Sequence, residues 1–418
     1  MRPAFRVTII NQFYPPDGAA TGQLLDELAA GLHWQGLQVR VLASQPAYEA
    51  LQDRATAQEH TGYATIERLS VLTASRRIRD RTLNGLFFCL RCILRLLHPR
   101  DRGDVLLLTT EPPFLPLLGL LTRLLFGQPY ACLIYDLYPD IAVQLGVLSW
   151  RNPVPRIWRW CNWQAWRRAS AILVLSSTMK AHLAAQCPEV AERIEVIHHW
   201  ADTERIVPLP KARNWFAREH GLVELFTVLY SGNLGRCHDA ETILQAACEL
   251  QGEPVQFVFV GRGTKYDTCR ERTRHWQLGN CYFLPYQERA TVPYSLTACD
   301  LGLVSLAPGL EGLTAPSKLY GMLAAGHPVA AICESHSYLR SLLQEAGCGA
   351  AFNNGDSHGL AQYVRALAAD PARAKRLGQA GRRYVLAHFS LKLAASQYAR
   401  ILTACTAAGA LAPSEAVR

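Results

Sequence analysis

The sequence contains no apolar run long enough to cross a bilayer. Its most apolar run, residues 113–126, is too short and holds two prolines and Arg123, which indicates a buried helix following a strand. Residues 1–4 lead directly into an apolar strand, without the apolar stretch and small-residue cleavage site of a secretory signal. We therefore expect a cytoplasmic protein.

The 13 cysteines form no recognisable metal-binding pattern. Only Cys89 and Cys92 have CxxC spacing, and no second pair completes a zinc site. The pair lies in an apolar, helix-like run, which favours ordinary packing. An odd number of scattered cysteines is typical of a reducing compartment, and we expect no metal.

Positive charge is in excess, with a formal net charge of +9, and it is unevenly distributed. Eight arginines and two aspartates occur from Arg76 to Arg102, whereas five arginines, five tryptophans and no acidic residue occur from Trp150 to Arg168. Arginine and tryptophan on amphipathic helices suit an anionic membrane surface. The alternative is that these helices pack on a sheet with solvated arginines. No nucleic-acid motif accompanies the charge, so we expect no nucleic-acid partner.

The chain of 418 residues exceeds what one hydrophobic core usually supports, so we expect two domains. In the first half, short β-branched runs alternate with helical stretches. The strands are expected at residues 7–10, 39–43, 105–108, 131–135, 171–175 and 194–197, and the helices at 22–35, at 113–126 and from 178. This alternation predicts a parallel sheet covered on both faces.

Two prolines interrupt the pattern at residues 206–211, and the alternation then restarts. Strands are expected at residues 226–230, 255–260, 282–284, 301–305, 329–332 and 348–352, with helices at 240–250 and 317–325 and further helices up to 404. The sequence therefore predicts an α/β protein with two successive doubly wound, Rossmann-like domains.

Ligands of open parallel sheets bind beyond the carboxyl ends of the strands. After the first strand, Gly18 and a helix expected to start near Gly22 can bring backbone N–H groups to a ligand; the alternative is a structural loop. Asp136 and Asp140 follow strand 131–135 and can bind sugar hydroxyls or handle a proton. For these, the alternative is a turn with a helix-capping aspartate.

In the second half, Gly232, Asn233, Gly235, Arg236 and His238 lie between a strand and a helix. Two glycines, an arginine and a helix N-terminus suit a diphosphate. The pattern is neither GxGxxG nor a P-loop, which disfavours NAD and ATP.

Two further segments repeat this theme. Gly261 and Gly263 follow the next strand, and Ser317 marks a helix start with Lys318 placed to reach a phosphate. The alternative for the latter pair is an N-cap followed by a surface lysine.

Taken together, the segments 12–17, 136–140, 196–202, 231–235, 316–320 and 324–329 resemble those of the family 4 retaining glycosyltransferases of bacterial cell-surface polysaccharide synthesis. The resemblance is to the colanic-acid and O-antigen branch, and order and spacing match over nearly the whole chain. It implies a GT-B fold, with two Rossmann-like domains facing a central cleft. Residues 1–206 would bind the acceptor and 207–387 the nucleotide-sugar, with a last helix at about 388–408 packing back on the first domain. It implies no metal and no cofactor beyond a UDP- or GDP-linked sugar.

Two departures from this family stand out. The family's E-x7-E glutamates, the second of which contacts ribose, fall on Leu313 and Gly321, which leaves Glu311 as a candidate stand-in. The slots for an arginine and a lysine on the diphosphate hold Asn233 and His238. Arg236 and Lys318 are therefore the expected cations. The first-domain histidine often found to contact the sugar is also absent near Asp136.

The leading hypothesis is transfer of a sugar, with retention, from a nucleotide-diphosphate donor to a lipid-linked glycan in exopolysaccharide synthesis, by an enzyme peripherally associated with the inner face of the plasma membrane. The expected catalytic residues are Asp136, Asp140, Arg236 and Lys318. The expected donor-binding residues are Gly18, Gly232, Asn233, Gly235, His238, Gly261, Gly263, Ser317, Leu319 and Tyr320. The alternatives are a nucleotide-sugar 2-epimerase of the same fold and, because the glutamates are missing, a catalytically weak scaffold of a polysaccharide-synthesis complex.

Overall fold

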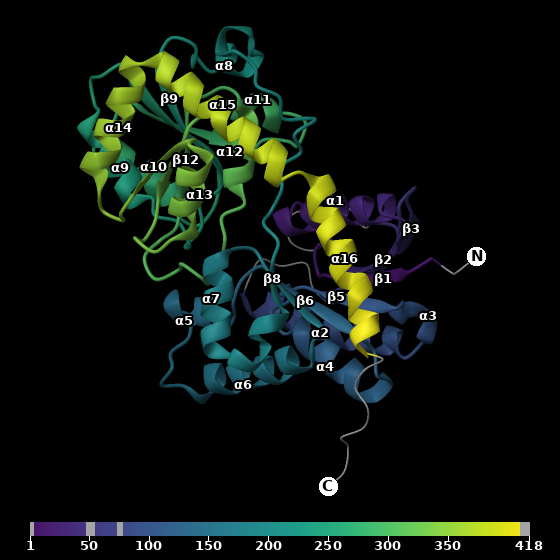
Figure 1. Cartoon of the computed structure of the whole chain (residues 1–418). Coiled ribbons are helices and arrows are strands. Elements are labelled where there is room, and N and C mark those ends of the chain that lie inside the picture. The colour runs from purple at the N-terminus through teal and green to yellow at the C-terminus, as the bar shows by residue number, and fades with distance from the viewer. Residues whose placement is uncertain (1–3, 47–54, 73–77, 410–418) are drawn as a thin grey trace. The chain divides into compact units, whose positions relative to one another are not determined.

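The computed structural model describes residues 4–46, 55–72 and 78–409 (Figure 1). The chain forms two compact units: unit 1 comprises residues 1–198 and 391–418, and unit 2 comprises residues 199–390. The proline-containing segment at which the sequence pattern restarts therefore belongs to unit 2, and the last helix, α16 (Leu391–Gly409), belongs to unit 1.

Unit 1 contains a sheet of eight strands in the order β3-β4-β2-β1-β5-β6-β7-β8. The strands are β1 (Arg6–Ile10), β2 (Gln38–Ser44), β3 (Gln58–His60), β4 (Ala64–Leu69), β5 (Val105–Leu108), β6 (Tyr130–Ile134), β7 (Ala171–Val174) and β8 (Ile194–Val196). All neighbours pair in parallel except β3 and β4, which are antiparallel. The central strands are apolar and buried because helices cover both faces of the sheet.

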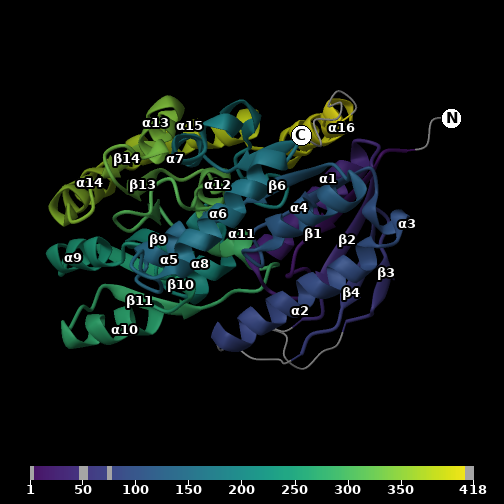
Figure 2. The ribbon, with the colours of Figure 1, turned by 90° about the horizontal axis from the view of Figure 1, so that it is seen from below.

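The helices of unit 1 lie in two layers (Figure 2). They are α1 (Ala20–Trp34), α2 (Ile78–Leu96), α3 (Pro99–Arg102), α4 (Leu115–Phe126), α5 (Asp140–Gln144), α6 (Pro153–Arg168), α7 (Ser177–Gln186), the 3₁₀ helix η1 (Pro188–Arg193) and α16. α1 and α16 pack together on one face, and α2, α4 and α6 cover the other. A Cβ at Gly31 of α1 would lie 2.7 Å from the Ala395 Cβ of α16, so the glycine permits this close approach.

Unit 2 contains a parallel sheet of six strands in the order β11-β10-β9-β12-β13-β14. The strands are β9 (Phe226–Asn233), β10 (Val255–Arg262), β11 (Cys281–Pro285), β12 (Leu301–Ser305), β13 (Val329–Ile332) and β14 (Gly349–Phe352). The order reverses between β9 and β12, which is where open α/β sheets place their ligands.

The helices of unit 2 also form two layers. They are η2 (Lys211–Arg213), α8 (Trp215–Glu219), α9 (Glu241–Glu249), α10 (Tyr266–His275), α11 (Val292–Leu296), α12 (Lys318–Ala325), α13 (Tyr338–Ala346), α14 (Ser357–Ala369) and α15 (Pro371–His388). α9 and α14 pack against each other over one buried cluster, and α12, α13 and α15 pack together elsewhere on the sheet. α12 begins at the carboxyl end of β12 and so brings its first residues to the expected ligand region.

One arginine of α15 holds α12 in place. The guanidinium of Arg382 donates to the carbonyl oxygens of Thr203 (2.8 Å), Ile206 (2.6 Å) and Ala324 (2.7 Å). It thereby ties the segment that precedes the domain's first strand to the carboxyl end of α12, where a positive charge is also favourable. A Cβ at Gly378 would overlap the carbonyl oxygen of Gly326, so α15 crosses this end of α12 at its closest possible distance.

Candidate functional site

The glycines after β9 and β10 are part of the sheet. Both strands extend beyond the expected residues, and Gly261 pairs with Gly232 and Arg262 with Asn233. A Cβ at Gly261 would overlap the carbonyl oxygen of Gly232, and one at Gly263 would overlap that of Leu234. The side of each glycine on which a Cβ would lie is filled by the protein's own backbone, which accounts for glycine at both positions. Contact of Gly261 and Gly263 with a ligand stays a prediction.

Gly232 has a different neighbour. Its φ is +117°, and a Cβ there would lie 3.3 Å from the Cε atom of Lys318. The lysine side chain therefore passes directly over the end of β9. Its Nζ atom lies 3.2 Å from the carbonyl oxygen of Asn233 and 5.0 Å from the centre of the Tyr230 ring. The structure thus brings together three residues of the expected donor site: Gly232, Asn233 and Lys318.

His238 supports the lysine as a neutral imidazole. Its Nδ1 lies 2.8 Å from the carbonyl oxygen of Ser305, which can only accept, so Nδ1 carries the proton. Nε2 then accepts a hydrogen bond from Lys318 Nζ at 3.1 Å. Burial, together with the charges of Lys318 and Lys265, lowers the pKa of His238 to about 3. His238 therefore stays uncharged at neutral pH and adds no positive charge of its own.

The charge of Lys318 is not neutralised within the described residues. Its side chain is partly exposed, and no carboxylate forms an ion pair with it in residues 4–46, 55–72 or 78–409. Desolvation lowers the pKa of Lys318 to about 7. A cation held in this way favours an anionic ligand, because the ligand would supply the missing counter-charge.

Two helix N-termini face this region, and only one has an open cap. At α9, Asp239 accepts from the backbone N–H of Thr242 at 3.1 Å and from its hydroxyl at 2.8 Å. The protein's own side chain therefore caps this helix N-terminus. At α12, the side chain of Ser317 makes no capping hydrogen bond. The N-terminus of α12, which carries Lys318, is therefore the one positioned to bind an anion.

The other expected donor residues are placed differently. Arg236 is exposed in the turn after β9, with no hydrogen bond or ion pair among the described residues, and Gly235 lies beside it. Leu319 is fully buried, and the Tyr320 ring packs edge-on against His199 and Phe389. Both side chains point into the core, so the predicted contact of Leu319 and Tyr320 with a donor would be made by their backbone.

The positions of the missing glutamates are also defined. Leu313 is buried, and Gly321 lies one turn into α12, where a Cβ would meet Leu296 at 3.2 Å. Glu311 is buried, and burial together with the charges of Tyr320 and Glu311 keeps the pKa of Tyr338 well above its usual range. Glu311 therefore lies in the interior of unit 2, near the Tyr338 hydroxyl.

In unit 1, Asp140 forms an ion cluster. It is the first residue of α5, and its Oδ1 atom accepts from Arg159 at 2.5 Å and from Gln186 at 2.8 Å. Burial raises the pKa of Asp140, but hydrogen bonds from His182 and Gln186 and the charge of Arg159 outweigh it, so the net shift is downward. The carboxylate is therefore held by α6 and α7, as a structural aspartate is.

The remaining two expected residues of unit 1 lie close to strand ends. Asp136 is half-buried after β6, and its backbone N–H donates to the hydroxyl of Thr110 at 3.4 Å. Gly18 lies two residues before α1, which begins at Ala20. No group of three or more metal-ligating side chains occurs in the described parts of the chain.

Three groups of the unit 2 site were missed by the sequence reasoning. The ring of Tyr230 looked like an ordinary core residue at the end of a strand, and the carbonyl of Ser305 has no sequence signal at all. Lys265 donates to the carbonyl oxygen of His238 at 2.5 Å. Its position two residues after Gly263 was a signal, because it places a second lysine at the same edge of the sheet.

The two halves of the chain match known families. The Glycosyltransferase Family 4 model matches residues 21–205, and the Glycosyl transferases group 1 model matches residues 214–384. The chain belongs to the family 4 glycosyltransferases. It is 27% identical over 273 residues to WbjE of Pseudomonas aeruginosa, named as a probable glycosyltransferase, which covers 65% of this chain and 68% of WbjE. It is 32% identical over 117 residues to WcaI of Escherichia coli K12, assigned to colanic acid biosynthesis as a glycosyl transferase, covering 28% and 29% of the two chains.

Solved structures of this glycosyltransferase's fold are similar over almost the whole chain. A sucrose-phosphate synthase from Thermosynechococcus elongatus has a TM-score of 0.77 at 17% identity and covers 97% of this chain and 100% of that structure. Anabaena HepE, solved in complex with UDP and glucose, has a TM-score of 0.72 at 15% identity and covers 96% and 99%. The fold is GT-B, as the sequence resemblance implies.

Proposed function

We propose that this glycosyltransferase transfers a sugar from a nucleoside-diphosphate donor to a lipid-linked glycan, with retention of the anomeric configuration, in the synthesis of a cell-surface polysaccharide. We infer a nucleoside-diphosphate donor from Lys318, a cation with no carboxylate partner among the described residues, at the uncapped N-terminus of α12. The complexes of HepE with UDP and glucose, and the colanic acid assignment of WcaI, support the donor class and the product class.

In the proposed reaction, the bond between the anomeric carbon and the diphosphate oxygen breaks while an acceptor hydroxyl oxygen bonds to the same carbon. The departing diphosphate oxygen keeps the bonding electron pair and accepts the hydroxyl proton, and attack on the face that the diphosphate leaves retains the configuration. Lys318 and the N-terminus of α12 stabilise the negative charge that grows on the diphosphate, and no metal is needed for this. Arg236, exposed in the adjacent turn, approaches the same diphosphate once the donor is bound.

Neutral His238 keeps the lysine ammonium directed over β9. Because it accepts a hydrogen bond without adding charge, it leaves the charge of Lys318 available to the donor. Gly232, Asn233 and Ser317 line this position by their backbone or by an exposed side chain. In unit 1, we assign the contact with sugar or acceptor to Asp136, which is half-buried beyond the carboxyl end of β6.

Donor hydrolysis by the purified chain, screened across UDP- and GDP-sugars without an acceptor, tests this proposal. We expect Lys318→Ala to lower turnover by about 100-fold or more, the usual effect of removing one stabilising group from a developing oxyanion. Lys375→Ala, which removes an exposed lysine of α15, is the matched control and should retain full turnover. Equal turnover of wild type and Lys318→Ala would contradict the proposal.

The proposed acceptor is carried by a lipid, and unit 1 has a surface suited to a membrane. None of the helices in the described residues is long and apolar enough to span a bilayer. However, α2 and the residue after it expose five leucines at helical spacing, each by half or more: Leu83, Leu86, Leu90, Leu94 and Leu97. Such a stripe is typical of a helix that lies in the membrane interface.

Two described arginines of this region have partners within unit 1, and Arg76 and Arg77 lie outside the described residues. Arg95 forms an ion pair with Glu67, and Arg102 donates to the carbonyl oxygen of Leu96 at 2.8 Å. We propose that the exposed leucines supply the apolar contact of this membrane-binding surface, on the cytoplasmic face, and that the arginines add the preference for anionic lipid.

Flotation with anionic phosphatidylglycerol vesicles at low and high salt tests membrane binding. Changing Leu86 and Leu90 together to glutamine should reduce the bound fraction at both salt concentrations, because it removes apolar contact without changing charge. High salt should reduce the binding of the wild type by screening its arginines. Leu386→Gln, on the exposed face of α15, is the control. Unchanged flotation of the double variant would exclude α2 as the binding element.

A further inference from the structure

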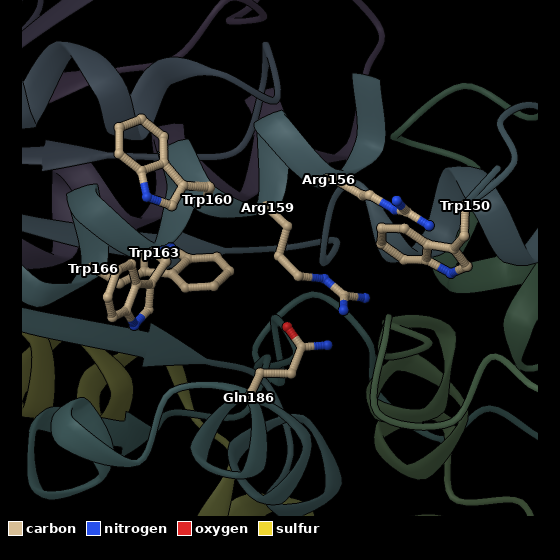
Figure 3. Close-up of a pocket in the computed structure, with 7 residues that line it drawn as sticks. All are labelled: Trp150, Arg156, Arg159, Trp160, Trp163, Trp166 and Gln186. Atoms are coloured by element: carbon tan, nitrogen blue, oxygen red, sulfur yellow. The ribbon is translucent and has the colours of Figure 1, made fainter. Parts of the chain in front are cut away.

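Unit 1 contains a pocket that the donor chemistry does not use. It is an open cavity of about 570 Å³ between α6 and α7, within the size range of small-molecule sites. Figure 3 shows Arg159 and Gln186 between a group of three indoles and a second, smaller group. The complete lining is Trp150, Arg156, Arg159, Trp160, Trp163, Trp166 and Gln186.

The lining favours an anion. Four indoles, two guanidiniums and an amide form it, and no carboxylate does. The nearby carboxylate of Asp140 is already neutralised by Arg159 at 2.5 Å, and Glu189 accepts from the Nε1 of Trp163 at 3.1 Å. Arg156 is exposed and forms no hydrogen bond or ion pair with any described residue, so one guanidinium remains for a ligand.

Two buried donors in the wall also lack acceptors. Neither the Nε of Arg159 nor the Nε1 of Trp166 has a hydrogen-bond partner, and the Oε1 of Gln186 has none either. Buried polar groups of this kind are costly unless something satisfies them. The oxygens of a phosphate bound in the pocket would bring acceptors next to the two N–H groups after small side-chain shifts.

The pocket opens beside an apolar ridge. Val154, Ile157 and Trp160 follow one another at three-residue spacing on α6, and each is exposed by half or more. A wholly polar ligand would gain nothing from this ridge. A ligand with a phosphate and a hydrocarbon chain would use both features, because indole rings and aliphatic side chains pack on hydrocarbon while the guanidiniums bind the phosphate.

We propose that the pocket between α6 and α7 binds the phosphate group of a lipid. The phosphate lies against Arg156, with the unpaired N–H groups of Arg159 and Trp166 as further donors, and the first part of the chain lies on Trp160 and the ridge. This inference rests on the proposed membrane-linked function, since the lipid is either a membrane phospholipid or the carrier of the glycan acceptor. The shared chemistry is a phosphate ester on an apolar chain.

Calorimetric titration of the full chain with water-soluble ligands tests the site without a bilayer. Dihexanoyl phosphatidic acid, kept below its micelle concentration, and farnesyl phosphate are the lipid probes, and glycerol phosphate is the probe without a chain. We expect at least one lipid probe to bind about tenfold more tightly than glycerol phosphate. The tighter of the two lipids identifies the source, phospholipid or acceptor carrier. Equal binding of all three would overturn the proposal.

Variants locate the binding. Arg156→Ala and Trp160→Ala change exposed side chains, so the fold should persist, and each should weaken lipid binding about fivefold or more. Arg168→Ala on the same helix and Trp34→Ala on α1, which is 71% exposed, lie outside the pocket and should bind as the wild type does. Unchanged binding by both pocket variants would overturn the proposal. Donor hydrolysis in the same variants reports separately on the proposed function.

Discussion

Asp140 in unit 1 and Lys318 in unit 2 are both charged residues placed after a strand, but their surroundings are opposite. Asp140 has its counter-charge within the unit, since Arg159 lies 2.5 Å away and Gln186 adds a second hydrogen bond. Lys318 is surrounded by a carbonyl oxygen, a neutral imidazole and an aromatic ring. One charge is therefore neutralised within its own unit, whereas no carboxylate among the described residues neutralises the other. The second arrangement favours an anionic ligand.

The largest expected effect on stability comes from distorting the end of β9, over which the Lys318 side chain lies. Gly261→Ala places a methyl group on the carbonyl oxygen of Gly232 and forces alanine to a φ of +139°. We expect the free energy of unfolding of unit 2 to fall by about 3 kcal/mol, measured by chemical denaturation. Gly279→Ala, with nothing within 4 Å of the added Cβ, is the matched control. A loss as large in the control would show that clash at this register is not the cause.

The structural role of Asp140 predicts a smaller loss. Arg159→Ala leaves a buried carboxylate without its cation and removes a guanidinium stacked at 3.9 Å on the Trp150 ring. We expect the free energy of unfolding of unit 1 to fall by about 2 kcal/mol. Arg156→Ala, one turn earlier and without an ion pair, should change stability by less than about 0.5 kcal/mol. If the two variants were equally stable, Asp140 would not be a structural aspartate.

The unneutralised lysine predicts a pH dependence of donor binding. Free Lys318 has a pKa near 7, and a bound diphosphate raises it, so above pH 7 binding must take up a proton. Affinity for a nucleotide-sugar should be constant below pH 7 and fall by up to about tenfold per pH unit above it. Titration between pH 6 and 9 measures this. In Lys318→Arg, whose guanidinium stays protonated, the slope should disappear; a flat wild-type profile would mean that Lys318 does not meet the diphosphate.

The smallest predicted effect is a gain in stability. The pKa of Lys318 is lowered from 10.5 to about 7 on folding, so below pH 7 the partly desolvated ammonium lowers the stability of unit 2, and this cost declines as pH rises towards 10.5. At pH 6, the free energy of unfolding of Lys318→Met should therefore exceed that of the wild type by about 1 kcal/mol, and this difference should shrink at pH 9. If the variant were less stable than the wild type at pH 6, the result would indicate that a negative charge neutralises Lys318 in the folded chain.

The sequence predicted the architecture because the two sheets are built from continuous apolar strands. β5, β12 and β13 have the expected bounds, and both doubly wound sheets are confirmed. β3 and β4 were missed, because their polar, alternating residues resemble a loop. β9 and β10 were ended too early, since glycine signals a turn in sequence and only the facing strand shows that it pairs.

The candidate site was predictable only in part. Lys318 was predicted because a lysine at a helix start can reach an anion that the helix N-terminus also attracts, although the sequence left a surface lysine as the alternative. Leu319 and Tyr320 were assigned to the donor from the motif alone, and their burial depends on packing by Phe389 and His199, which are remote in sequence. Among the tryptophans of α6, Trp160 is exposed and Trp166 is buried, a difference that residue type cannot reveal.

Unit 2 is inserted into unit 1, because the chain leaves unit 1 at His198 and returns at Leu391. The two crossings adjoin each other, with Ala201 bridged to Ser390 and its N–H bonded to the carbonyl oxygen of Phe389 at 3.1 Å. During synthesis on the ribosome, unit 2 is therefore complete before unit 1 receives α16. A chain released before residue 391 therefore has every residue of unit 2 but lacks α16, which together with α1 covers one face of the unit 1 sheet.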